Sequence, residues 1–387
     1  MLLSDNSSEL RELKRRLRQF MLLMFGLHLS SSCTLVAQTT DSPSGDSNKS
    51  WRATTDLKTD YGNPTRTSES HTQNGNRTVD VRSLQTRGPD GNFQPYQDIE
   101  TEAVRVNATT THTTTRTFVR DSSGAKTLFQ VTEEEKRASP DGDSKVVRTT
   151  SNPDANGNLQ MVQREVQETR KTNPDVEETK TTVSLPSING GLAPAMQTEE
   201  HQKRSGNTVE IQKTTLLPDG AGNWQVGEVR QSTIKNEGEN SSTETRVSRP
   251  DADGKLEEIS RTVGKESVDP SGEKRNSEET YSVDVPGAGR DSGLHLIQRT
   301  TTTQRTNSSG QQTTATTEQT NPADPGSGLQ VSTVSIDTVR SGSTCAQATR
   351  TIQMSDANGN LNVVSVDMTK SDNAKAIQVQ IAPSNAK

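Results

Sequence analysis

The sequence predicts an all-β fold, an elongated array of about nine to ten antiparallel β-hairpin repeats, thin-cored or partly a single-layer meander. Three observations predict it. Glycine-containing turns recur at a fixed period of roughly 33 residues, the segments between them are rich in Thr and Val, and only 26% of the 387 residues are hydrophobic, with 3% aromatic. An ordinary globular domain is close to half apolar, so two-sided burial of the strands is not expected.

One turn recurs almost unchanged along the chain. The letters Asp-Ala-Asn-Gly-Asn-Leu occupy residues 154–159 and again 356–361. Related turns place a glycine near the end of each unit, and the first three of these glycines are 33 residues apart. A constant period of this length indicates a repeat architecture. The series comprises Gly91, Gly124, Gly157, Gly191, Gly222, Gly254, Gly293, Gly328 and Gly359.

A second turn lies near the middle of most units. It contains Pro, Asp, Asn or Gly in positions typical of β-turns, where Pro sets the first corner and Gly takes the left-handed conformation. Turns therefore recur about every sixteen residues, and each unit is predicted to be one hairpin. These second turns begin at Ser139, Thr172, Arg204, Asn236, Asp269, Asn307 and Arg340.

The segments between turns alternate as strands do. Leu329 and Val331 share one phase, and Val334 and Ile336 share the next; the same slip follows Leu361 and Val363. A slip at the same place in two units predicts a β-bulge. Runs such as 109–117 and 311–320 are Thr-rich and show no 3.6-residue stripe, which argues against helices.

The ends of the chain differ from its middle. Basic residues followed by the apolar run 20–29 and small residues predict a signal peptide over 1–37, although a membrane-surface helix and lipidation at Cys33 remain alternatives. We expect a flexible linker over 38–50, the hairpin array over 51–370 and a C-terminal tail over 371–387. Cys345 then has no partner for an internal disulfide, and is either a free thiol or a site of intermolecular pairing.

The sequence predicts no catalytic, cofactor-binding or metal-binding residues, no cofactor, and no enzymatic activity. The five histidines (His28, His71, His112, His201 and His295) form no spaced pair with each other or with Cys. Asn152, Asp154 and Asn156 precede Gly157 in a calcium-like pattern, and Asp251 and Asp253 precede Gly254 in a second one. The second loop has Arg249 at the first ligand position, and the closing Glu position holds Gln163 or Ser260. We therefore interpret these acids as turn residues.

The residue pattern offers two candidate binding surfaces, a Thr-rich face and a set of exposed aromatic side chains. A regular ladder of Thr would order water, and exposed aromatic side chains would stack on sugar rings. The Thr phase is irregular, and the four candidate aromatics occupy different registers, so polar Thr on a solvent face is the preferred interpretation. These aromatics are Trp51, Tyr96, Trp224 and Tyr281.

The repeated turn also resembles that of the tyrosine-aspartate repeats of secreted shell-forming proteins. The resemblance covers six residues per unit, from Asp154 to Leu159 and from Asp356 to Leu361. The tyrosine-aspartate pair itself is missing and the period is longer. It therefore implies shared hairpin chemistry and no shared function.

The hypothesis from sequence is a secreted or cell-surface structural protein without catalysis: a stalk, matrix element or fibre subunit. An adhesin or carbohydrate-binding surface protein is the alternative. Expected partners are further copies joined through edge strands, or a cell-surface or glycan partner. A net charge of −6 from 44 basic and 50 acidic residues, with mixed signs, argues against nucleic acid. No transmembrane span is expected after signal cleavage.

Overall fold

The computed structural model describes residues 48–59, 63–121, 123–283, 293–307, 310–321, 328–341, 346–356 and 358–371. The predicted signal peptide, most of the predicted linker and of the predicted C-terminal tail, Cys33 and Cys345 lie outside them. The described residues form twenty β-strands, which confirms the predicted all-β class. These are β1 (Asn48–Thr59), β2 (Thr65–Asn74), β3 (Arg77–Arg87), β4 (Phe93–Arg105), β5 (Thr110–Arg120), β6 (Lys126–Ala138), β7 (Ser144–Pro153), β8 (Leu159–Asn173), β9 (Val176–Pro186), β10 (Leu192–Ser205), β11 (Thr208–Pro218), β12 (Trp224–Glu237), β13 (Asn240–Pro250), β14 (Leu256–Val268), β15 (Lys274–Ser282), β16 (His295–Asn307), β17 (Gly310–Thr320), β18 (Leu329–Ser341), β19 (Ala346–Ser355) and β20 (Leu361–Ser371).

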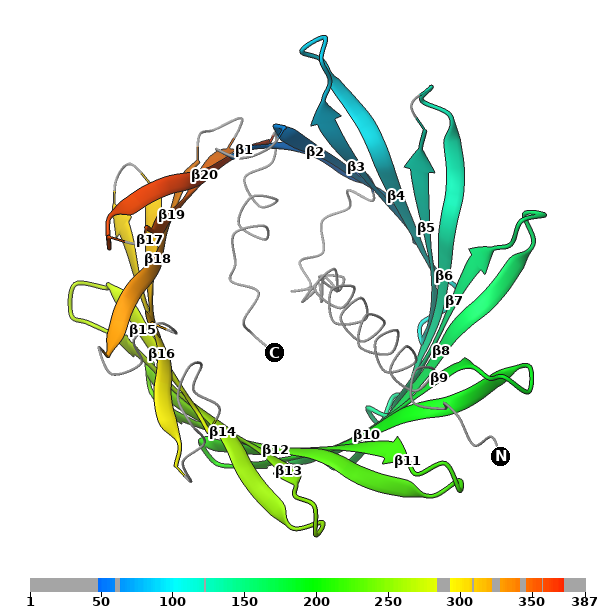
Figure 1. Ribbon diagram of the computed structural model, residues 1–387. Coiled ribbons are helices and arrows are strands. Elements are labelled where there is room, and N and C mark those ends of the chain that lie inside the picture. Colours follow the sequence, from blue (N-terminus) through cyan, green and yellow to red (C-terminus); the bar gives the residue numbers. More distant parts are fainter. Residues whose placement is uncertain are drawn as a thin grey trace, which may run out of the picture. The chain divides into compact units, whose positions relative to one another are not determined.

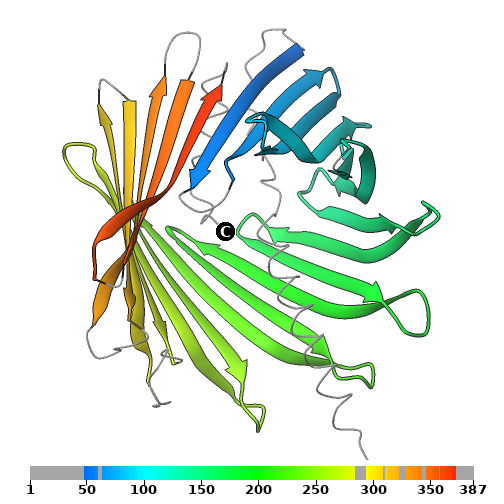
Figure 2. The same cartoon turned by 45° about the horizontal axis from the view of Figure 1, so that its top comes forward.

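The sheet closes on itself. Each strand pairs antiparallel with the next one in sequence, and the first strand pairs with the last, from Ala53 opposite Ser371 to Thr59 opposite Ser365. Figures 1 and 2 show the strands running around a barrel in chain order. The predicted meander of hairpins is confirmed, but the expected elongated, open array is wrong.

Nine bulges give a physical reason for the curvature. In nine hairpins the strand that follows the turn carries one extra residue near its start, and a bulge bends a strand and increases its twist. All nine lie toward the barrel end where odd-numbered strands finish and even-numbered strands begin, which we call the bulge rim. The two bulges predicted from sequence, in β18 and β20, are among them. The extra residues are Tyr96, Phe129, Val162, Ala195, Gly227, Ile259, Ile297, Ser332 and Val364.

The repeated turns are glycine-dependent. Gly157 and Gly359 have φ values of 82° and 83°, the left-handed region that only glycine enters without strain. Asp154 stabilises the first of these turns because its Oδ1 accepts the backbone N–H groups of Asn156 and Asn158, at 2.8 and 2.9 Å. The same pattern at Asp356 confirms that these acids serve the turn.

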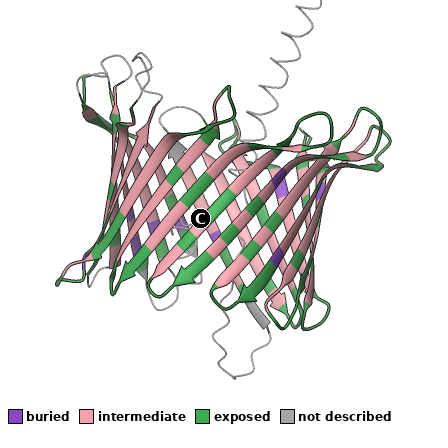
Figure 3. Cartoon of the chain, turned by 90° about the horizontal axis from the view of Figure 1, so that it is seen from below, coloured by how far each residue is buried: buried purple, intermediate pink, exposed green. Residues whose placement is uncertain are grey.

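The described residues contain little apolar core. Their fully buried hydrophobic side chains are Ala53, Val131, Val339 and Ala348, and Figure 3 shows that most strand positions are intermediate or exposed. A barrel pairs every strand edge through the backbone ladder, so closure does not require a large apolar interior. The low hydrophobic content therefore accompanies a hollow fold.

Candidate functional site

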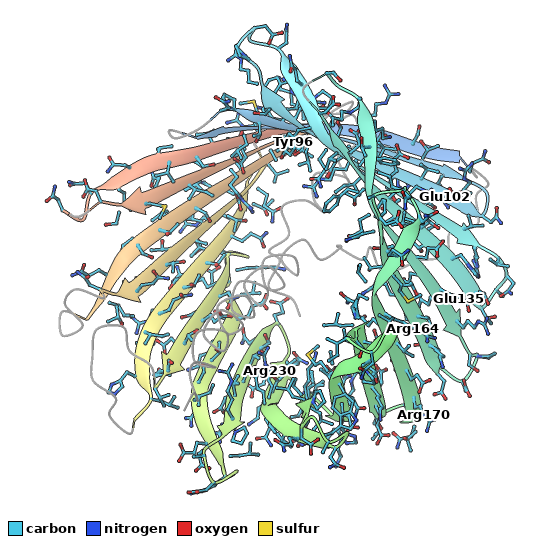
Figure 4. The ribbon with its side chains drawn as sticks, turned by 45° about the vertical axis from the view of Figure 1, so that its right-hand side comes forward. Tyr96, Glu102, Glu135, Arg164, Arg170 and Arg230 are labelled. Atoms are coloured by element: carbon cyan, nitrogen blue, oxygen red, sulfur yellow. The ribbon has the colours of Figure 1, made fainter. Side chains whose placement is uncertain are left out.

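The strand register sorts the side chains into two walls. Residues directly opposite one another on paired strands point to the same face, and successive residues alternate. Following the pairs around the barrel places Thr55 and Arg230 on the same face, with Glu102 and Glu135 on the other. In Figure 4, Arg230 lies on the inner side and Glu102, Glu135 and Arg170 on the outer side.

Hydroxyl groups define the inner wall. Thr55 and Thr369 hydrogen-bond through their Oγ1 atoms at 2.8 Å across the seam where the barrel closes. Five further hydroxyl pairs join neighbouring strands at 2.9–3.3 Å, all on the inner wall. Such pairs stabilise a sheet by a few tenths of a kcal/mol each. They are Thr101–Thr115, Thr132–Thr150, Thr169–Thr179, Ser232–Thr245 and Thr300–Thr317.

Charged clusters interrupt this hydroxyl surface, and two of them are centred on Arg148 and Arg350. Arg148 lies between Glu134 and Glu165, with N–O distances of 2.6 and 3.1 Å. Arg350 forms two hydrogen bonds to Asp337, at 2.7 and 3.0 Å, and the Asp337 side chain is only 9% exposed. Each cluster joins neighbouring strands on the inner wall by charge-assisted hydrogen bonds.

A third inner cluster contains an aromatic ring. Trp51 stacks on His71 with ring centroids 5.6 Å apart and planes 10° from parallel. His71 Nδ1 is 2.6 Å from Asp80 Oδ1 on the next strand. These residues come from β1, β2 and β3, which the register aligns in one row. The inner wall of the described strands is therefore predominantly polar, with hydroxyl, amide and paired charged groups, and apolar side chains such as Val119 and Ile352 are interspersed among them.

The outer wall carries ion pairs over most of its circumference. Asp98, with a side chain only 7% exposed, contacts Arg120 at 2.7 Å. Further outward pairs join Arg77 to Glu102 and Lys145 to Glu168, both at 2.7 Å. Charged side chains on a lipid-facing wall cost about 2–4 kcal/mol each for Arg or Lys at mid-membrane. Most of this wall is therefore suited to water or protein.

Apolar side chains gather on the outer wall at the bulge rim. The strand after each turn begins with an outward apolar residue in most hairpins, and several of these are exposed, including Leu159 at 50% and Leu256 at 46%. They form two layers, about 10 Å in height from the strand rise. A bacterial outer-membrane barrel has an apolar band of about 25 Å. The first layer contains Phe93, Leu159, Leu192, Trp224, Leu256, Leu329 and Leu361.

The turn carboxylates have lowered pKa values. The backbone N–H groups of Asn158 and Asn156 donate to Asp154 and lower its pKa below the ordinary value for aspartate. The backbone N–H and side-chain amide of Asn360 lower the pKa of Asp356, and the hydroxyl of Ser123 is the largest cause of the lowered pKa of Asp121. All three carboxylates favour the ionised form because they accept hydrogen bonds within their own turns.

The histidines that the structure describes lie on separate strands. His71 belongs to the inner cluster, whereas His112 and His201 contact Glu135 and Glu178 on the outer wall, at 3.3 and 3.5 Å. Within the described residues no group of three His, Cys, Asp or Glu side chains could hold a metal ion. Nor does any helix in that part of the chain have the length and apolarity to cross a membrane.

The candidate aromatics do not form one surface. Register places Trp51 on the inner wall and Trp224 on the outer wall at the bulge rim, so the two tryptophans face opposite sides of the sheet. Tyr281 is an outward residue whose hydroxyl donates to Glu279 at 2.8 Å, and Tyr96 is the extra residue of a bulge. The inner wall itself was not foreseen from sequence, because no local pattern marks one polar face as interior.

No protein-family model matches the chain, and no curated protein matches it. Several solved structures share the general arrangement. OccK3 (OpdO) of Pseudomonas aeruginosa aligns at 9% identity with a TM-score of 0.43, covering 84% of this chain and 95% of that chain. The FrpB iron transporter of Neisseria meningitidis (F3-3 variant) aligns at 9% identity with a TM-score of 0.39, covering 84% and 74%. Salmonella typhi OmpF in complex with daunomycin aligns at 6% identity with a TM-score of 0.36, covering 84% and 97%. These likenesses are too distant to carry a function to this chain.

Closure overturns the structural hypothesis. A fibre, stalk or matrix element assembled through edge strands needs free edges, and β1 and β20 pair with each other. An adhesin or glycan-binding protein displaying ligands along an elongated face is not retained either, because the sheet curves around a lumen. The expectation of no membrane span also falls, since a closed barrel is the form in which strands cross bilayers.

Proposed function

We propose that the barrel is a passive, non-catalytic conduit for water and small polar solutes at the surface of the cell that exports it. The observation that carries the proposal is the closed ring of strands with a polar inner wall. Twenty strands tilted at about 40° enclose a backbone cylinder about 40 Å across, and natural barrels of 16–18 strands already leave an aqueous channel. Hydroxyl pairs such as Thr101–Thr115 line the wall, and its charges at Arg148 and Arg350 are paired with carboxylates, which suits neutral solutes and hydrated ions.

Planar-bilayer conductance tests the proposal. Purified protein added to a bilayer should produce stable, voltage-independent steps that scale with salt concentration. Protein that reaches the bilayer, as detected by flotation with vesicles of the same lipids, but gives no conductance would contradict the proposal.

A matched pair of variants tests which wall the solutes meet. Thr115 lies on the inner wall and the adjacent Thr114 on the outer wall, because neighbours on a strand alternate. Thr115→Lys should shift the reversal potential in a salt gradient toward anions, whereas Thr114→Lys should leave it unchanged. Equal shifts would place the current outside the lumen.

A further inference from the structure

One sector of the outer wall lacks the charges found elsewhere. On β18 the outward residues are Leu329, Val331, Val334 and Ile336, followed by Thr338. The outward side chains of β19, between the two apolar strands, are neutral Gln and Thr. The apolar sector, as we call it, consists of Leu329, Val331, Val334, Ile336, Leu361, Val363, Val366 and Met368.

The sector extends over most of the wall height. Leu361 and Met368 are seven steps apart on β20, and one of these steps is the bulge residue Val364, so the span is about 20 Å along the strand and about 15 Å in height at a tilt of about 40°. Val331, Leu361, Val363 and Met368 are between 37% and 42% exposed. The sector covers more than half of the apolar band, about 25 Å tall, by which membrane barrels face hydrocarbon, and exposed apolar patches mark interaction sites.

Two cations lie at the end of the sector away from the bulge rim. Arg340 and Lys370 both point outward on either side of Gln347, and both are exposed. Neither forms an ion pair with another side chain that the structure describes, whereas most outward cations of the β4–β8 wall are paired. Long basic side chains beside an apolar surface extend toward anionic headgroups, and each contributes roughly fivefold to membrane affinity.

We infer that the outer surface of β18–β20 is the part of the barrel that contacts lipid, with the apolar sector against acyl chains and Arg340 and Lys370 at anionic headgroups. The charge pattern favours lipid over a second copy, because two copies meeting through this sector would bring unpaired cations of the same sign to one interface. The inference does not depend on conduction. A barrel that conducts across a bilayer needs the charged remainder of its outer wall covered by protein, whereas a barrel that carries no current can rest on the membrane by this sector alone.

Tryptophan quenching by brominated lipid tests the inference. In a full-length background carrying Trp51→Phe and Trp224→Phe, Ile336→Trp reports on the apolar sector, and Gln231→Trp reports on the outer wall of β12. With vesicles of phosphatidylcholine and phosphatidylglycerol containing acyl-brominated phosphatidylcholine, the Ile336→Trp fluorescence should fall by at least half and the Gln231→Trp fluorescence should stay constant. Equal quenching of the two reporters, or none in vesicle-bound protein, would overturn the inference.

A charge-deletion pair supplies a second test without a new tryptophan. Arg340→Gln with Lys370→Gln should weaken binding to the same vesicles by about 30-fold. Lys203→Gln with Lys235→Gln removes two outward cations of β10 and β12 and is the matched control, expected to change binding less than twofold. Equal losses from both pairs would overturn the inference, as would a dimer that forms through this sector while lipid quenching is absent.

Conductance recorded from the same preparations separates the two proposals. Sector-specific quenching without current removes the conduit function and leaves the lipid surface standing. Current with no sector-specific quenching removes the proposed lipid surface and leaves the conduit function standing.

Discussion

The β4–β5 wall and the β18–β20 wall use their two faces in opposite ways. On β5 the inner side chains are mainly Thr, and on β4 the outer ones include Asp98, Glu100 and Glu102. On β18–β20 the inner side chains include Asp337 and its partner Arg350, whereas the outer ones are apolar or neutral except for Arg340 and Lys370 at one end. Both walls are built from the same hairpin with the same bulge. The hairpin therefore fixes the backbone and leaves the chemistry of each face free to vary.

Removing β20 should have the largest effect, because it opens the barrel and abolishes the difference between the two walls. A chain that ends at Asn360 loses the partner of both β1 and β19, and the two exposed edges should recruit strands from other copies. We expect concentration-dependent association by sedimentation velocity, with β-structure retained by circular dichroism. A chain that ends at Ser371 keeps β20 and should behave as the full-length protein. A monodisperse chain ending at Asn360 would show that closure is not what suppresses association.

Substitution of Gly310 should have the next largest effect. Gly310 has a φ of 135°, and a Cβ there would overlap the carbonyl oxygen of Val339 on β18. We expect Gly310→Ala to cost at least about 3 kcal/mol in the free energy of unfolding, because backbone must move. Gly157→Ala, in a turn where a Cβ meets open space, should cost about 1 kcal/mol from its φ alone. Urea unfolding of both variants compares the two costs, and similar values would argue against the clash.

Two of the buried carboxylates, Asp337 and Asp98, should respond alike although they face opposite sides of the sheet. Asp337 pairs with Arg350 inside, and Asp98 pairs with Arg120 outside, each through two hydrogen bonds. Asp337→Asn and Asp98→Asn should each cost about 2 kcal/mol, since a partly exposed Arg then loses its ion pair. Double-mutant cycles with each Arg measure the coupling. A coupling near zero for only one pair would show that the walls differ in solvation as well as in composition.

Acid should act equally on the turns of both walls, with the smallest effect. The lowered pKa values of Asp121 and Asp356 mean that these turns stabilise the fold above the ordinary pKa of aspartate, and this contribution is lost as pH falls through the lower folded values. Thermal unfolding between about pH 5 and pH 2 should show a decline that Asp121→Asn and Asp356→Asn each reduce slightly. A stability that rises on acidification would reverse the expected sign.

The bulges and turns could be predicted from sequence, but the closure of the sheet into a barrel could not. The phase slip after Val331 and after Val363 predicted two bulges that the structure contains, because a bulge reverses alternation within a few residues. The Asp-Ala-Asn-Gly turns could also be predicted, because a turn depends on a few consecutive residues. The pairing of Ala53 with Ser371 joins residues at opposite ends of the chain and leaves no local trace.

Low apolar content was a misleading guide to shape. It correctly excluded a packed globular core but favoured an open array, whereas a barrel satisfies its backbone groups with few buried side chains such as Val131 and Val339. The inner wall was likewise hidden. Thr115 and Glu102 are both polar, so alternation along their strands does not reveal which side becomes the lumen until the ring is closed.

The pairing of the first strand with the last has a consequence for biosynthesis. Every other pairing joins strands that are neighbours in sequence, so hairpins form while the chain is still being delivered. The hydrogen bond between the hydroxyl groups of Thr55 and Thr369 joins residues 314 positions apart. It can form only after β20 has been delivered. Until then the growing sheet has two exposed edges, and a chain interrupted before β20 has no means of protecting them. The final eleven-residue strand therefore determines whether the preceding nineteen form a barrel or an aggregate.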